Sequence, residues 1–341
     1  MLVLDRVYKF ILGYIISFIK DWFMNIVFPD AGSLGSDLDL SLFHNLGNFI
    51  KWENTPEKEL EDRIRNADVI ITNRIILDEE QLKAAKKLKL IALTATGFNN
   101  VNREYCQKNR IALANVASYS TDSVAQHTFT ILLYLLEHSR YYDDYIRREA
   151  YLEDQSFANV SRPWNEINGK NWGIIGLGSI GRKVASIAEA FGARVFYYST
   201  SGVERPEKWK RLSLEDLLRT SDILSIHAPL NGQTENLISS GQFNIMKKNA
   251  ILLNLGRGAI VNEEALIEAL KDRKIAAAGL DVLCSEPPLQ GSPLLNFVQE
   301  DRLFITPHNA WGSLESRMRL VKEVYKNITA FNNGIERNRI V

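Results

Sequence analysis

A glycine-rich turn between an apolar strand and an amphipathic helix is the feature that most constrains this chain. The turn has the pattern Gly-x-Gly-x-x-Gly, formed by Gly176, Gly178 and Gly181. Residues 171–175 before it are typical of a buried strand, and 179–191 after it has apolar residues at helical spacing. In this setting the first glycine permits a tight turn, the second lets the backbone approach a pyrophosphate, and the third allows close helix–strand packing. The pattern alone is weak, but with this strand and helix it predicts a dinucleotide site.

The phosphates of such a dinucleotide lie at the helix N-terminus, where backbone N–H groups have no acceptor within the helix. We therefore expect Ser179 and Ile180 to contact the cofactor together with the three glycines. Pro229 and Thr234, which follow a later predicted strand, are also expected to contact it.

The sequence leaves the choice between NAD and NADP open. The strand predicted at 194–198 is followed by Ser199 and Thr200, where an NAD site usually has Asp or Glu bound to the ribose. No carboxylate would repel a 2′-phosphate there, and Arg205 is close enough in sequence to contact one. Alternatively, the two hydroxyls bind the ribose of NAD and Arg205 is solvated. Because only one basic residue closely follows the strand, the sequence slightly favours NAD.

Length and composition indicate a soluble protein of about two domains. The chain has 341 residues, of which 45% are hydrophobic, and its 41 basic side chains balance 41 acidic ones. Zero net charge argues against nucleic acid as the main partner. Cys106 and Cys284 form neither a disulfide framework nor a zinc-site pattern. We therefore expect no metal, and a cytoplasmic location.

Residues 1–23 contain a short apolar run, which is well below the ~20 residues that span a bilayer. No small-x-small cleavage site follows it, as a secretion signal would require. Met24 stands directly before a predicted strand. We expect Met24 to be the natural start, 1–23 to be an extension and no membrane partner, with a peripheral membrane helix as the alternative.

Strand-like and helix-like segments alternate along the rest of the chain, which predicts parallel sheets with right-handed crossovers. The predicted strands fall into two sets, at 25–29, 69–72, 90–94 and 111–115, and at 171–175, 194–198, 222–227, 250–254, 275–280 and 303–306. Two sets imply an α/β chain of two domains. We assign 24–120, completed by 312–341, to a substrate-binding domain and 121–311 to an NAD(P)-binding domain. A single long helix is predicted over 121–148.

Chemically useful side chains follow the ends of three predicted strands. They are Arg257, Asp281, Glu286 and His308. The carboxyl ends of parallel strands are where sites form in α/β proteins. A guanidinium can bind a carboxylate through two parallel hydrogen bonds, and an imidazole can exchange a proton near neutral pH. Each of these residues alone could be structural, but together at one sheet edge they favour an active site.

The other four histidines carry less weight as catalytic candidates. His227 follows a strand and is expected near the cofactor, whereas His127, near the start of the long predicted helix, is expected to be structural. His44 and His138 lie at polar ends of helical segments.

From 24 to about 335 the chain resembles the D-isomer-specific 2-hydroxyacid dehydrogenases. The loop 96–102, Thr-Gly-Phe-Asn-Asn-Val-Asn, is similar to the family's substrate loop, with Asn99 and Asn102 where Asp is common. The segment 119–127 is similar to the family's helix entry between domains, with Gln126 in place of the usual Glu. The resemblance implies two Rossmann-like domains with the active site in the cleft between them.

The resemblance also implies roles for the residues at the strand ends. Arg257 binds the substrate and His308 is the acid/base. Glu286 orients the histidine, and Asp281 holds the nicotinamide amide.

For the substrate, the resemblance implies that backbone N–H groups around Thr96 and Gly97 bind its carboxylate, and Trp311 is an expected contact. The segments 308–311 and 198–202 look most like the glycerate dehydrogenase and hydroxypyruvate reductase branch. This implies a homodimer that transfers a hydride between NAD(P)H and the C2 carbonyl of a small 2-oxo acid. Phosphoglycerate dehydrogenase, D-lactate dehydrogenase and a dinucleotide-sensing co-repressor-like protein are the alternatives.

Overall fold

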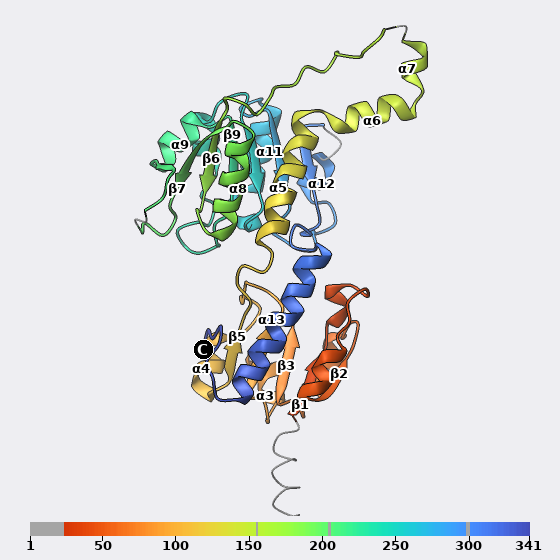
Figure 1. Ribbon diagram of the computed structural model, residues 1–341, viewed down its shortest axis with the longest axis vertical. Helices are drawn as coiled ribbons and strands as arrows, with labels where there is room; N and C mark the ends of the chain where they lie inside the picture. The colour runs from red at the N-terminus through yellow and green to blue at the C-terminus, as the bar shows by residue number, and fades with distance from the viewer. Residues whose placement is uncertain (1–23, 155, 204–205, 298–300) are drawn as a thin grey trace, which may run out of the picture. The chain divides into compact units, whose positions relative to one another are not determined.

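The computed structural model describes residues 24–154, 156–203, 206–297 and 301–341. Residue contacts divide the chain into two compact units (Figure 1). The first unit consists of the chain up to Tyr119 together with Leu314–Val341, and the second unit is Ser120–Ser313. The predicted extension at 1–23 and Arg205 lie outside the described residues, so the expectations for them stay predictions.

The first unit is built on a parallel sheet of five strands in the order β2-β1-β3-β4-β5. The strands are β1 (Met24–Phe28), β2 (Gly47–Lys51), β3 (Val69–Thr72), β4 (Leu90–Leu93) and β5 (Ala112–Ala114). The helices are η1 (Ala31–Leu34), η2 (Ser41–Leu46), α2 (Glu57–Ile64), α3 (Glu79–Ala84), α4 (Arg103–Asn109) and α13 (Leu314–Asn332). Every residue of β3 and β4 is buried, as in strands covered on both faces. The C-terminal helix α13 packs against β4, so both ends of the chain contribute to this unit.

The second unit contains a seven-stranded parallel sheet in the order β12-β11-β10-β9-β6-β7-β8. Its strands are β6 (Asn171–Ile175), β7 (Arg194–Tyr198), β8 (Lys210–Arg211), β9 (Ile223–Ile226), β10 (Ile251–Asn254), β11 (Ala277–Leu280) and β12 (Leu303–Ile305). Its helices are α5 (Thr121–Leu136), α6 (Ser139–Arg147), α7 (Ala150–Glu153), α8 (Ser179–Ala190), α9 (Leu214–Thr220), α10 (Ser240–Ile245), η3 (Gly258–Ile260), α11 (Glu263–Lys271) and α12 (Pro293–Phe297). The strand order reverses direction between β6 and β9. Ligands of open α/β sheets bind beyond the carboxyl ends of the strands at such a point.

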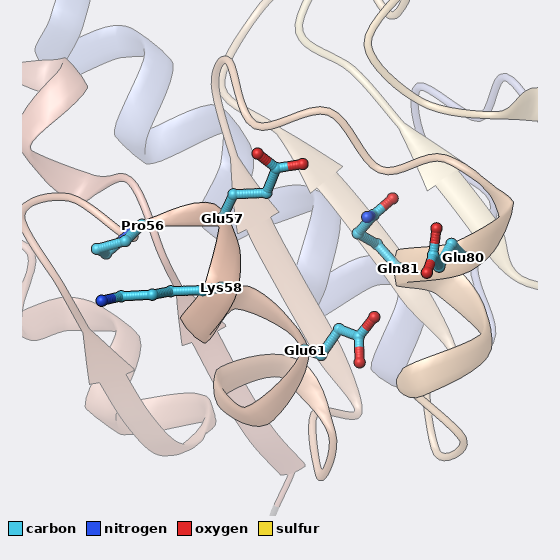
Figure 2. A pocket seen from close by; sticks show the side chains of 6 residues that line it. All are labelled: Pro56, Glu57, Lys58, Glu61, Glu80 and Gln81. Atoms are coloured by element: carbon cyan, nitrogen blue, oxygen red, sulfur yellow. The ribbon is translucent and has the colours of Figure 1, made fainter.

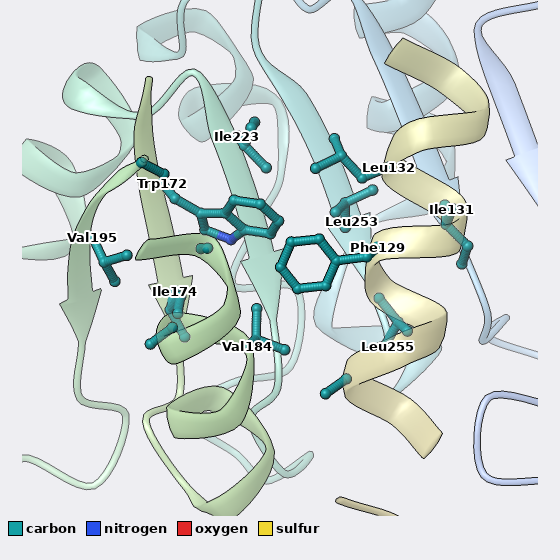
Figure 3. Close-up of a cluster of buried hydrophobic side chains, with 14 of the residues drawn as sticks. Phe129, Ile131, Leu132, Trp172, Ile174, Val184, Val195, Ile223, Leu253 and Leu255 are labelled. Atoms are coloured by element: carbon teal, nitrogen blue, oxygen red, sulfur yellow. The ribbon is translucent and has the colours of Figure 1, made fainter. Parts of the chain in front are cut away.

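The core of the second unit fixes β6 and the glycine turn that follows it (Figure 3). Trp172 of β6 is inaccessible to solvent and packs on Phe129 of α5, with ring centroids 5.0 Å apart. The indole N–H donates to the Ser225 hydroxyl oxygen at 2.9 Å, so this buried donor is paired. Phe129 also stacks on Phe191, which follows α8, with centroids 5.5 Å apart. The two helices are thereby held against the strand whose end carries the turn.

The single helix predicted over 121–148 is wrong. The structure has α5 and α6, separated at His138, whose backbone is left-handed with φ 53°. A left-handed residue interrupts the hydrogen-bond ladder of a right-handed helix, so the chain changes direction there. The apolar positions that suggested one helix all lie in α5, and α6 buries none of its residues.

No helix among the described residues is both long and apolar enough to cross a membrane.

Replacing Phe129 with alanine should destabilise the second unit. The substitution removes both ring contacts and leaves a cavity beside Trp172, which typically costs ~3–5 kcal/mol. Urea unfolding followed by tryptophan fluorescence should therefore show a lower midpoint. Leu289→Ala is the matched control, because Leu289 is 72% exposed and its truncation should leave the midpoint in place. Equal midpoints for the two variants would contradict this packing.

Candidate active site

The glycine turn after β6 has the shape of a phosphate-binding turn. Gly176 has a left-handed backbone with φ 89°, and a Cβ there would lie 2.9 Å from the Ala228 backbone. A Cβ on Gly181 would lie 2.3 Å from the carbonyl oxygen of Gly176. Around Gly178, which caps α8, no heavy atom lies within 4 Å of an added Cβ. Two glycines are thus required by packing, and the third borders open space at a helix N-terminus, where a pyrophosphate fits.

The residues expected to surround this turn are placed by local structure. Ser179 and Ile180 open α8, at positions whose N–H groups have no acceptor within a helix. Thr234 is buried, and its hydroxyl donates to the Pro229 carbonyl at 2.7 Å while accepting from the Asn231 N–H at 2.8 Å. Thr234 therefore shapes the loop that begins at Pro229. Direct contact of Ser179, Ile180, Pro229 or Thr234 with a cofactor stays a prediction.

The segment expected at the adenosine ribose adjoins the glycine turn. The Gly176 N–H donates to the Tyr198 carbonyl at 3.0 Å, and Ser199 and Thr200 follow directly. Arg211 of the edge strand β8 donates to the Gly202 carbonyl at 3.3 Å. Sequence reasoning missed Arg211, because strand pairing rather than sequence proximity brings it to this loop.

Three neighbouring strands, β10, β11 and β12, end at the same edge of the sheet. They bring Arg257, Glu286 and His308 to that edge, as the sequence predicts. The loops after β10 and β11 touch closely, since a Cβ on Gly258 would lie 2.0 Å from the Leu283 carbonyl carbon. The Arg257 guanidinium donates to the Gly256 carbonyl at 2.8 Å and forms no ion pair within the described part of the chain.

His308 and Glu286 form a direct pair. The imidazole Nδ1 lies 2.5 Å from one carboxylate oxygen, and the other oxygen accepts the Leu283 N–H at 2.9 Å. Each side chain is 28% exposed, so the pair is reachable by a ligand. The Leu283 N–H holds the Glu286 carboxylate in place, and the carboxylate in turn orients the imidazole ring.

Asp281 holds the backbone of the loop that carries His308. The Asp281 carbonyl accepts the His308 N–H at 2.8 Å, and its carboxylate accepts the N–H groups of Asn309 and Ala310 at 3.0 and 3.1 Å. His308 has a left-handed backbone with φ 51°, a conformation that costs a non-glycine residue ~1–3 kcal/mol. Burial raises the pKa of Asp281, while hydrogen bonds from the Thr306 hydroxyl and the Ala310 N–H act in the opposite direction.

The structure places two further histidines close to this edge. His127, expected to be structural, has its Nε2 3.6 Å from an Asp281 carboxylate oxygen. His227 follows β9, and both of its ring nitrogens are buried without a hydrogen-bond partner among the described residues. Burial lowers the pKa of His227 to about 3, so the ring is neutral at physiological pH and is no proton donor there.

The residues predicted to contact the substrate lie in both units. In the first unit, the Thr96 hydroxyl donates to the Val116 carbonyl at 2.8 Å, which anchors the loop that continues to Gly97. Asn102, where Asp is common in the resembling family, still caps α4 by accepting the Tyr105 N–H at 2.9 Å. In the second unit, Trp311 is partly buried against the core.

A hollow of about 630 Å³ in the first unit lies between α2 and α3 (Figure 2). It is lined by Pro56, Glu57, Lys58, Glu61, Glu80 and Gln81. Three carboxylates against one ammonium make it unsuited to an anionic acid. Within the described ranges, no group of three or more His, Cys, Asp or Glu side chains could hold a metal ion.

Comparison with known proteins shows the family. Residues 129–310, more than half of the chain, match the family model described as D-isomer specific 2-hydroxyacid dehydrogenase, NAD binding domain. The chain is 32% identical to the hydroxypyruvate reductase of Blautia hydrogenotrophica, with 91% of this chain and 98% of the relative covered. It is 36% identical to the glyoxylate reductase of Aeropyrum pernix, over 90% of this chain and 91% of the relative.

A solved structure agrees with these sequence matches. D-lactate dehydrogenase from Aquifex aeolicus, complexed with NAD and lactic acid, superposes with a TM-score of 0.81 and 29% sequence identity, covering 91% of this chain and 96% of the other. The predicted pair of parallel α/β sheets is thereby confirmed. The chain belongs to the D-isomer specific 2-hydroxyacid dehydrogenase family and is an oxidoreductase that uses a nicotinamide dinucleotide.

Proposed function

We propose that this protein reduces small 2-oxo acids of the hydroxypyruvate and glyoxylate type to the 2-hydroxy acids, with glycerate dehydrogenase activity in the reverse direction. The observation that carries the proposal is the His308–Glu286 pair at the carboxyl edge of the nucleotide sheet. A positioned imidazole with a carboxylate partner is suited to donate a proton to a carbonyl oxygen. Relatives of matching length named hydroxypyruvate reductase and glyoxylate reductase support small acids as substrates.

Residues of the second unit hold the cofactor in this proposal. The turn formed by Gly176, Gly178 and Gly181 and the first residues of α8 would hold the pyrophosphate. A bound nicotinamide dinucleotide would supply the hydride for C2 of the acid. The Asp281 carboxylate would hold the nicotinamide amide.

His308 supplies the proton that reduction requires. Hydride arrival at C2 leaves negative charge on the carbonyl oxygen, and His308 protonates that oxygen. With Nδ1 bound to Glu286, proton transfer falls to Nε2. The Glu286 carboxylate holds the ring at Nδ1, so the orientation of Nε2 is set before the hydride moves.

Arg257 and the loop at Thr96 recognise the acid. A guanidinium without an acidic partner in the described chain can bind the oxo acid and stabilise its developing negative charge. In the first unit, no acceptor within the described residues takes the backbone N–H groups of Thr96 and Gly97. These donors suit the substrate carboxylate.

NAD is the slightly favoured dinucleotide. The hydroxyls of Ser199 and Thr200 can bind ribose oxygens directly after β7. Arg211, close to the Gly202 carbonyl, is a second basic residue, besides the predicted Arg205, through which a 2′-phosphate would be accommodated instead.

A panel of four acids, each with NADH and with NADPH, tests the proposed activity. The acids are glyoxylate, hydroxypyruvate, pyruvate and phosphohydroxypyruvate, and reactions without acid are the control. We expect the first two to give the highest kcat/KM, because relatives of matching length are named hydroxypyruvate reductase and glyoxylate reductase. A preference for pyruvate or phosphohydroxypyruvate would move the protein to another branch of its family. Cofactor binding without reduction of any acid would favour the co-repressor-like alternative.

We also propose that the protein is a homodimer, through an arm formed by α6, α7 and residues 156–166. The arm projects from the sheet of the second unit (Figure 1), and neither helix buries a residue. Phe157 is 98% exposed and Leu152 is 80% exposed, in a segment that also exposes Val160 and Trp164. Such an apolar surface is typical of an interface, and a second copy of the chain would cover it.

A charged side chain on the arm should weaken the dimer. Phe157→Asp places a carboxylate in the proposed interface, so light scattering at micromolar concentration should give a lower mass than for the native protein. Ile335→Asp is the control, because Ile335 is also exposed but lies in the first unit. A native protein that is already monomeric, or an unchanged mass for Phe157→Asp, would contradict the arm as interface.

The proposed location is the cytoplasm, without a nucleic-acid or membrane partner. Cys106 and Cys284 are free thiols, as is usual in a reducing compartment. Equal numbers of basic and acidic side chains give the chain no electrostatic preference for nucleic acid.

A further inference from the structure

A chain of hydrogen bonds connects α5 to the active edge of the second unit, which is the sheet edge where Arg257, Glu286 and His308 lie. His127 Nε2 lies 3.0 Å from the Thr306 hydroxyl oxygen, and that hydroxyl lies 2.7 Å from an Asp281 carboxylate oxygen. Thr306 follows β12 directly and stands two residues before His308. The three side chains come from segments far apart in sequence and meet where the cofactor and the proton donor are proposed to act.

The donor and acceptor of each of these hydrogen bonds follow from the number of hydrogens that each group carries. The Thr306 hydroxyl has one hydrogen, which it donates to Asp281, because an ionised carboxylate can only accept. The hydroxyl oxygen therefore accepts from His127, whose Nε2 carries a hydrogen. His127 thus directs the Thr306 hydroxyl, and the hydroxyl directs one oxygen of the carboxylate.

The Asp281 carboxylate also holds the loop after His308 in place. Its oxygens accept the Asn309 and Ala310 N–H groups, and the Asp281 carbonyl accepts the N–H of His308. The left-handed backbone of His308 is kept in place by these bonds. A carboxylate turned away from Thr306 would loosen both the loop and any group that the carboxylate binds.

Burial makes the chain of bonds stiff. Asp281 is 2% exposed and the His127 side chain 19% exposed. Burial lowers the pKa of His127, against the attraction of Asp281, so the ring acts as a neutral donor at physiological pH. In a poorly hydrated site few water molecules can replace a lost hydrogen bond, so removing one member is felt by the others.

We propose that His127 and Thr306 are positioning residues for hydride transfer, which through Asp281 hold the nicotinamide amide and the His308 loop in one arrangement. Neither residue is assigned contact with the substrate. The inference deepens the proposed function and rests on the role proposed there for Asp281.

Thr306→Val tests the inference, because valine has nearly the shape of threonine without the hydroxyl. The binding probes are NADH and ADP-ribose, which lacks the nicotinamide ring. We expect the variant to bind NADH ~3–10-fold more weakly and to lose a similar factor in kcat, the usual effect of one lost hydrogen bond. ADP-ribose should bind as it does to the native protein. Thr306→Ser, which keeps the hydroxyl, should restore both values.

Thr128→Val is the matched control. Thr128 is buried on the same helix as His127, but its hydroxyl donates to the Val124 carbonyl of that helix at 2.8 Å. This substitution should leave kcat and both dissociation constants unchanged. Equal weakening of NADH and ADP-ribose by Thr306→Val, or native values of kcat and NADH affinity, would overturn the inference.

A double-mutant cycle provides a second reading that does not depend on one variant folding well. His127→Leu removes the donor to Thr306, so the effect of His127→Leu with Thr306→Val should be smaller than the product of the single effects. Independent, multiplying effects would overturn the proposed connection. Reduction of no oxo acid by the native protein would defeat the proposed function, and the NADH and ADP-ribose comparison would still decide this inference.

Discussion

The buried carboxylate of Asp281 is the constraint on which the active edge depends. It is almost inaccessible to solvent, and it accepts hydrogen bonds from the loop after β12 and from the Thr306 hydroxyl. These bonds stabilise the left-handed backbone of His308, a conformation that is uncommon for a residue other than glycine. The Asp281 carboxylate therefore determines the position of the His308 backbone, and Glu286 determines the orientation of the imidazole ring.

Two carboxylates in one loop thus have different tasks because their surroundings differ. Asp281 lies inside the sheet edge, where it meets mostly backbone N–H groups, and burial raises its pKa. Glu286 is partly exposed and is bound to one backbone N–H and to the His308 ring. A buried carboxylate suits a fixed binding role, whereas a partly exposed one beside an imidazole suits support of a proton donor.

Much of the fold was predictable because it rests on local patterns. Apolar strands alternating with helices predicted the two parallel sheets, and the glycine turn was predicted from its strand, spacing and helix. Arg257, Glu286 and His308 were predicted as one group because each follows a strand, and parallel strands in one sheet end at one edge. The roles of these residues came from family resemblance and stay proposals.

Features that depend on distant contacts were not predictable. The strands β2 and β8 lie at the sheet edges, where little burial marks them in the sequence. The left-handed backbone at His138 is not marked by a glycine in the sequence, so α5 and α6 were predicted as one helix. His127 and Thr306 stand 179 positions apart, and nothing in either neighbourhood shows that they meet.

His308, held by Asp281 and Glu286, is proposed to deliver the proton in reduction. The most direct measurement is the stopped-flow rate of NADH oxidation by glyoxylate for His308→Gln, with His44→Gln of the first unit as control. Removing a positioned proton donor should lower the rate ~10²–10⁴-fold while NADH binds as before. A near-native rate for His308→Gln would show that His308 is not the proton donor.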